Sequence, residues 1–106
     1  MKETPNLKYI KELSGDDEAF EKQFINIIKT ELPVEVETYE NTVKENKLFE
    51  TAEIVHKLKH KLNIFGLEDA YRLAVRYEED LKRGETILEG DFKGILEGVQ
   101  KFVNTL

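Results

Sequence analysis

Both histidines of the chain, His56 and His60, lie one helical turn apart in the segment VHKLKHKLNIFG. An imidazole that keeps one nitrogen lone pair can act as a nucleophile, a proton acceptor or a metal ligand. Three lysines lie among these histidines, and residues 54 to 67 include no acidic side chain. The whole chain is acidic, with a formal net charge of −6. Imidazoles and positive charge therefore coincide on one short segment of an otherwise acidic protein.

A helix over this segment would place a defined set of side chains beside His56. Residues three and four apart share a helix face. That face carries an aromatic ring, a small residue, a lysine, the second histidine and an amide, with two further lysines beside it: Phe49, Ala52, Lys59, His60 and Asn63, flanked by Lys57 and Lys61.

Glu78 is the carboxylate that the sequence places nearest to His56. Gly66 is typical of a helix end, and a hairpin turn there puts His56 ten residues before the turn and Glu78 twelve after it. The two side chains then lie at similar heights on adjacent helices. A carboxylate beside an imidazole accepts a hydrogen bond from one ring nitrogen and leaves the other lone pair outward. Nucleophilic chemistry at an imidazole needs that arrangement.

The stretch HKLKHKLNIFG resembles the motif of the histidine-containing phosphotransfer (HPt) family. In that motif a histidine is followed by any residue, a leucine, a lysine and a small residue, with a glycine ten positions after the histidine. His56, Leu58, Lys59 and Gly66 occupy those positions here. A leucine-glutamate pair on the family's next helix corresponds to Tyr77 and Glu78, and the resemblance extends over nearly all of the chain.

The resemblance implies specific roles. His56 would be the phosphoryl acceptor, Lys59 the cation beside the phosphoryl group, and Glu78 the residue that orients the imidazole. The protein would carry the phosphoryl group between aspartates of receiver domains, those of hybrid sensor kinases and of response regulators, in a multistep two-component phosphorelay. It would have no ATP-dependent kinase activity and no cofactor of its own, and magnesium would lie in the receiver domain.

The chain departs from the family where His60 replaces a glycine and Lys61 replaces a small residue. The residues expected to meet the partner are Phe49, Ala52, Lys57, His60 and Asn63. An imidazole fills space that glycine would leave open beside His56. We therefore hypothesise that His60 selects among receiver domains by shape.

Two other interpretations compete with phosphotransfer. Histidines at positions i and i+4 can bind a metal from one helix face, with Glu78 as a third ligand. Position 57 is lysine, so the glutamate of an H-E-x-x-H motif is missing. The other interpretation is an HPt-like binding module that does not transfer phosphate, which His60 and Lys61 favour.

The elements that would position these residues are amphipathic helices. We expect a short N-terminal helix opened by Thr4 and Pro5, then one long helix over about 17–46, kinked near Pro33, because its apolar positions keep one phase through the proline. Further helices are expected over 45–66, 67–84 and 88–106. Glycines at 90, 94 and 98 either permit close packing or make the last helix prone to fraying. The pattern predicts an all-α fold, an antiparallel up-down-up-down four-helix bundle with a short N-terminal helix.

Composition narrows the remaining possibilities. A chain of 106 residues fits one domain, 1–106. It has no cysteine, which excludes disulfides, thiolate catalysis and cysteine-bound zinc. The acidic balance argues against nucleic acid as a partner. No apolar run reaches the length of a membrane span, and the N-terminal residues lack a signal-peptide core, so a cytoplasmic location is expected. The expected state is a monomer, with a weak dimer as the alternative.

Overall fold

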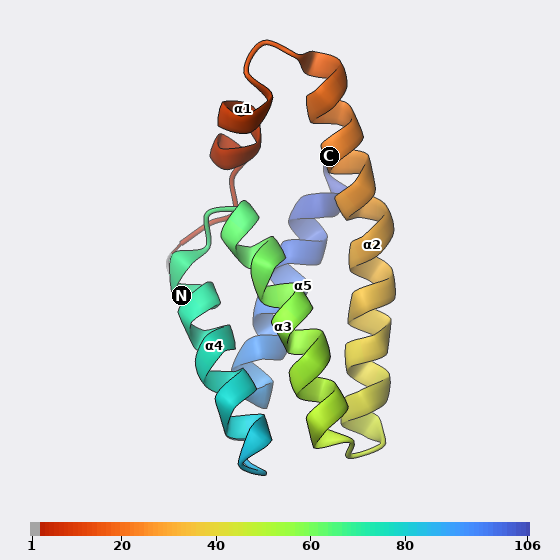
Figure 1. Cartoon of the computed structure of the whole chain (residues 1–106), viewed down its shortest axis with the longest axis vertical. Coiled ribbons are helices and arrows are strands. Elements are labelled where there is room, and N and C mark those ends of the chain that lie inside the picture. Colours follow the sequence, from red (N-terminus) through yellow and green to blue (C-terminus); the bar gives the residue numbers. More distant parts are fainter. Residues whose placement is uncertain (1–2) are drawn as a thin grey trace.

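The computed structural model describes residues 3–106, and this part of the chain forms five helices and no strand, which confirms the all-α prediction. The four longer helices run along the long axis of a molecule of 45 × 25 × 19 Å, with α1 beside one end of α2 (Figure 1). α3 and α5 each pack against both α2 and α4, and α1 packs on α2. The bounds are α1 Lys8–Ser14, α2 Glu18–Lys44, α3 Leu48–Ile64, α4 Glu68–Lys82 and α5 Glu89–Asn104.

The prediction of one long second helix is confirmed, since α2 continues through Pro33 (Figure 1). Asp17 caps its N-terminus, because the Asp17 side chain accepts a hydrogen bond of 3.0 Å from the backbone N–H of Phe20. Pro33 itself is exposed and removes one backbone donor from the helix. Burial of a continuous apolar stripe compensates for that loss, with Ile28, Leu32, Val36 and Tyr39 in the core.

The N-terminal helix begins at Lys8, so the prediction that Thr4 and Pro5 open it is wrong. The residues before Lys8 are held in a different way. The Glu3 carboxylate accepts hydrogen bonds from the backbone N–H groups of residues 69 and 70, at 3.1 and 2.7 Å. Glu3 thus caps the first turn of α4, where a negative charge is favourable. These bonds hold Glu3 against the start of α4, outside α1.

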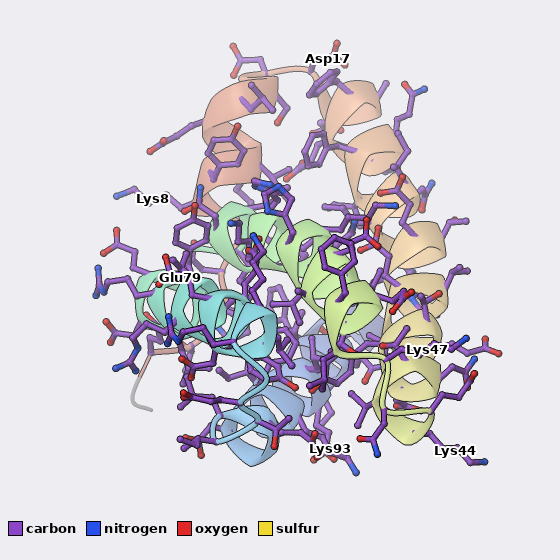
Figure 2. All side chains as sticks on the ribbon, turned by 60° about the horizontal axis from the view of Figure 1, so that its bottom comes forward. Lys8, Asp17, Lys44, Lys47, Glu79 and Lys93 are labelled. Carbon is purple, nitrogen blue, oxygen red and sulfur yellow. The ribbon has the colours of Figure 1, made fainter. Side chains whose placement is uncertain are left out.

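All five helices contribute to one hydrophobic core. Its polar members are hydrogen bonded, as the 2.8 Å contact between the Tyr39 and Tyr77 hydroxyl groups illustrates. Phe92 of α5 packs on both rings, with centroid distances of 5.3 and 5.2 Å. Charged side chains such as Lys8, Lys44 and Lys93 project outward from the helices (Figure 2). The core therefore joins every helix into one packed unit.

The glycines of α5 do not bring another helix of this chain close. A Cβ atom added at Gly90, Gly94 or Gly98 would meet no atom of the described chain within 4 Å. The expectation that they permit close packing is wrong for contacts within residues 3–106. They line a cavity of about 660 Å³ that residues of α4, α5 and the N-terminal segment enclose together.

Candidate functional site

The turn between α3 and α4 sets the height of His56 relative to Glu78. Gly66 adopts a positive φ of 75°, a conformation that glycine reaches without strain. An added Cβ at Gly66 would lie 2.7 Å from the Asn6 side-chain amide, so the turn is also closely packed. The chain reverses within Phe65–Leu67 and brings the two helices side by side.

His56 and Glu78 meet across this hairpin, with 3.0 Å between His56 Nδ1 and Glu78 Oε2. An ionised carboxylate can only accept hydrogen bonds, so the Nδ1–H group donates. In the neutral ring the lone pair then resides on Nε2. The His56 side chain is 54% exposed, whereas that of Glu78 is 10% exposed. The site is thus an accessible imidazole that a nearly buried carboxylate holds by a hydrogen bond.

Lys59 and His56 together lower the pKa of the Glu78 carboxyl. Lys59 Nζ donates to Glu78 Oε1 at 2.9 Å, and Lys82 Nζ lies 3.6 Å from Oε2. Burial by itself would raise the pKa of Glu78, but hydrogen bonds from Lys59 and His56, together with their positive charge, outweigh burial and lower the pKa. Glu78 is therefore an acceptor and not a proton donor near neutral pH. Lys82 is not among the predicted site residues, although its i, i+4 spacing from Glu78 indicates this contact.

His60 lies directly beside His56 on the surface of α3. The two ring centroids are 5.1 Å apart and the ring planes meet at 86°, so one edge faces the other ring. Both side chains are exposed. The structure therefore brings the two imidazoles together, as their i, i+4 spacing predicts.

Lys61 does not flank His56, and this part of the predicted basic patch is wrong. Its side chain is 10% exposed and points toward α2, where Nζ lies 3.1 Å from Glu31 Oε1 and 3.0 Å from Glu35. The sequence carries a signal for this orientation. Lys61 follows Leu58 by three residues and precedes Phe65 by four, which places it on the buried stripe of α3.

Ala52 does not belong to the predicted partner surface, because it is 1% exposed and lies in the core. It precedes the buried Val55 by three residues, so the two share the inward face of α3. The other predicted contact residues are exposed. Phe49 is an exposed aromatic ring, at 64%, two turns before His56. Together with Lys57, His60 and Asn63 it lies on the outer side of α3.

No group of three or more His, Cys, Asp or Glu side chains that could hold a metal occurs in residues 3–106. Within the same residues, no helix combines the length and the apolar character needed to cross a membrane. Comparisons with family models, with curated proteins and with solved structures return no match. The geometry around His56 is therefore the basis on which a function can be proposed.

Proposed function

We propose that this protein is a histidine phosphotransfer protein of a multistep two-component phosphorelay, with His56 as the phosphoryl carrier. One observation carries the proposal: an exposed imidazole whose Nδ1–H group is held at 3.0 Å by a charged, nearly buried carboxylate. That arrangement leaves a lone pair on Nε2 of a side chain that is 54% exposed, and it holds the ring in one orientation. These are the requirements of a nucleophile that must meet a second protein.

In the proposed transfer step, one bond forms to phosphorus as another breaks. The Nε2 lone pair attacks the phosphorus of an aspartyl phosphate on a receiver domain and forms an N–P bond. The P–O bond to the aspartate breaks, and its electron pair leaves with the carboxylate oxygen. The reverse step at a second receiver domain returns the phosphoryl group to an aspartate. The step consumes no ATP, and magnesium in the receiver domain would neutralise charge on the transferring oxygens.

Glu78 and Lys59 would act together on His56. Glu78 holds the Nδ1 proton and stabilises the positive charge that the ring gains when Nε2 is phosphorylated. Lys59 bonds to Glu78 and so holds the carboxylate in place and charged. Its ammonium group would also offset the negative charge of the phosphoryl group, which is roughly two units on phosphorylated side chains. Of these two roles of Lys59, the family resemblance implies only the second, that of a cation beside the phosphoryl group.

The proposed architecture is an antiparallel up-down-up-down four-helix bundle in a single domain, working as a cytoplasmic monomer. Its support is that α2, α3, α4 and α5 lie along one axis and that α3 and α5 both contact α2 and α4 (Figure 1). Receiver domains of hybrid sensor kinases and response regulators would dock on the outer side of α3. Phe49, Lys57, His60 and Asn63 are exposed there for contact.

The decisive experiment incubates the full chain with a phosphorylated receiver domain and measures acid-labile phosphate on the protein. The wild-type chain should acquire label. His56→Gln should fold, as circular dichroism would show, and acquire none, whereas His60→Gln should still acquire label. Label retained by His56→Gln and lost by His60→Gln would overturn the assignment. Binding of the receiver domain without any labelling would favour the binding module over phosphotransfer.

A further inference from the structure

The exposed imidazole pair on α3 has the spacing of a two-histidine chelate. His56 and His60 place their ring centroids 5.1 Å apart, with the planes at 86°. A zinc ion about 2.1 Å from one nitrogen of each ring, with a tetrahedral angle between them, brings the two ring centroids to about 5 Å. The observed separation matches this distance, and both exposed rings can turn about their side-chain bonds until one nitrogen of each faces a shared ion. We propose that His56 and His60 form a two-imidazole binding site for zinc and related divalent transition-metal ions.

Glu78 prepares His56 for this role. A ligating histidine usually donates its other ring N–H group to a carboxylate, which fixes the tautomer and makes the ligand nitrogen more basic. His56 Nδ1 donates to Glu78 Oε2 at 3.0 Å, so Nε2 is the available ligand atom. The Glu78 carboxylate is nearly buried and is also held by Lys59 Nζ at 2.9 Å.

The lysines around His56 repel a bound cation less than the sequence alone predicts. Of the three lysines in the segment, Lys59 is paired with Glu78 at 2.9 Å. Lys61 points to α2 and is paired with Glu31 and Glu35. Lys57 is exposed, so water and salt weaken its repulsion of a bound ion. Two of these three lysines are thus paired with carboxylates, and the exposed Lys82 of α4 shares Glu78 at 3.6 Å.

The ligand set determines which ions bind. Imidazole suits zinc, nickel and copper, whereas magnesium prefers oxygen ligands. No third His, Cys, Asp or Glu side chain joins the pair in a metal-holding group within residues 3–106. Water would therefore complete the coordination, and the ion would exchange readily with solvent. Copper should bind more tightly than nickel or zinc, following the usual order of stability.

Metal binding would compete with phosphorylation, a consequence that depends on the proposed function. The Nε2 lone pair of His56 can form a bond to the metal or to phosphorus, but not to both. Zinc at the pair would then block transfer, and a phosphorylated His56 would no longer serve as a ligand. The site would make the phosphorelay step sensitive to free transition metal.

The binding test needs no partner protein. ZnCl2 is titrated into the full chain by calorimetry in a buffer that does not bind metal. The wild-type chain should show one site that is missing from the double variant His56→Gln/His60→Gln, which measures background binding by carboxylates. Each single variant should bind zinc more weakly by a factor greater than ten, and Glu78→Gln by roughly tenfold, as expected for loss of an outer hydrogen bond. Lys57→Gln should bind at least as tightly as wild type, and MgCl2 should give no signal.

Equal zinc affinity in the wild-type chain and the double variant would overturn the site. Nuclear magnetic resonance provides a second readout, because the chain contains only two histidines. Zinc should shift the His56 Nε2 resonance and leave the Nδ1–H group bonded to Glu78. Unchanged nitrogen resonances in both rings at saturating zinc would contradict the proposal.

A labelling experiment separates this inference from the proposed function. Receiver-dependent labelling is measured with and without ZnCl2, and the ratio is compared between the wild-type chain and His60→Gln. The ratio should fall in the wild-type chain and change less in His60→Gln, which cannot chelate. Equal zinc sensitivity in both would contradict the competition. Absence of label in every sample would contradict phosphotransfer, while the calorimetric result still decides the metal site.

Discussion

At the scale of single residues, the chemistry of His56 depends on a charged Glu78. The Glu78 carboxylate accepts one hydrogen bond from His56 and one from Lys59, at 3.0 and 2.9 Å. Such charge-assisted bonds are stronger than neutral ones and hold both partners in place. The same carboxylate therefore orients the imidazole and links α4 to α3.

This arrangement predicts a pH-dependent cost for Glu78→Gln. The folded-state pKa of Glu78 is lowered from an ordinary value of 4.5, so its contribution to stability is fully present above pH 4.5. That contribution is lost as the pH falls through the folded-state pKa. At pH 7 we expect Glu78→Gln to lower the free energy of unfolding by about 2 kcal/mol, the range for hydrogen bonds to charged groups. The difference from wild type should shrink steadily below pH 4.5.

Urea unfolding at several pH values measures this difference, and Glu79→Gln is the matched control. Glu79 is the exposed neighbour of Glu78 on α4, seen at the outer edge of the helix in Figure 2. Its substitution should change stability by less than about 0.5 kcal/mol at every pH. A cost of Glu78→Gln that does not vary between pH 7 and acid would show that the pairing with Lys59 and His56 contributes nothing.

At the scale of elements, a buried ion pair joins α3 to α2. Lys61 occupies a position on the inward stripe of α3 and reaches Glu31 and Glu35, which lie one turn apart on α2. A buried ion pair contributes little net free energy, but removing one partner leaves an uncompensated charge. The pair therefore favours one register of the two helices over others.

We expect Lys61→Ala to lower the free energy of unfolding by about 2 kcal/mol, because Glu35 is mostly buried and would lose its counter-ion. Lys57→Ala, on the exposed face of the same helix, should cost less than about 0.5 kcal/mol. The double variant Lys61→Met/Glu35→Met should recover most of the loss, since apolar side chains of similar size replace the pair. Thermal unfolding compares the four chains. No recovery in the double variant would contradict this account.

The glycines offer a second comparison between elements. Gly94→Ala should raise stability by about 1 kcal/mol, because alanine is the better helix former and its Cβ meets no described atom within 4 Å. Gly66→Ala should lower stability by about 1–2 kcal/mol, because the φ of 75° strains any residue with a Cβ. Denaturant unfolding of both variants measures the difference. A gain from Gly66→Ala would contradict the role of that turn.

At the scale of the whole molecule, one core receives side chains from all five helices. Residues as distant in sequence as Ile10 of α1, Tyr77 of α4 and Phe92 of α5 are fully buried in it. Elements that share one core lose their packing together, which makes unfolding cooperative in small domains. The chain should therefore behave as a single domain.

Coincident unfolding curves would test this expectation. Far-ultraviolet circular dichroism follows the helices, and tyrosine fluorescence follows the core, because Tyr39 and Tyr77 are buried there and the chain has no tryptophan. The two signals should give the same midpoint and slope in urea. A separate early transition in the fluorescence would show that the core is not one unit. Size-exclusion chromatography over a range of concentrations tests the expected monomer.

Much of this molecule follows from the amino-acid sequence alone. Apolar spacing determines where α2 to α5 lie, including the passage of α2 through Pro33, because a helix must bury one stripe. Gly66 ends α3 for a local reason, its backbone freedom. The meeting of His56 with Glu78 then follows from counting residues on both sides of the turn, since two helices of constant rise keep a common height.

Tertiary structure decided what the sequence left open. Glu3 caps α4, so the residues before Lys8 do not form the start of α1. Lys61 faces α2 and its two carboxylates, and Ala52 lies in the core. A helical repeat assigns each residue to a face, but which face meets a neighbour depends on how the helices pack. Charged side chains can pair only after that packing has brought distant residues together. The surface around His56 is therefore smaller and less basic than the sequence alone predicts, because Lys61 and Ala52 are not part of it.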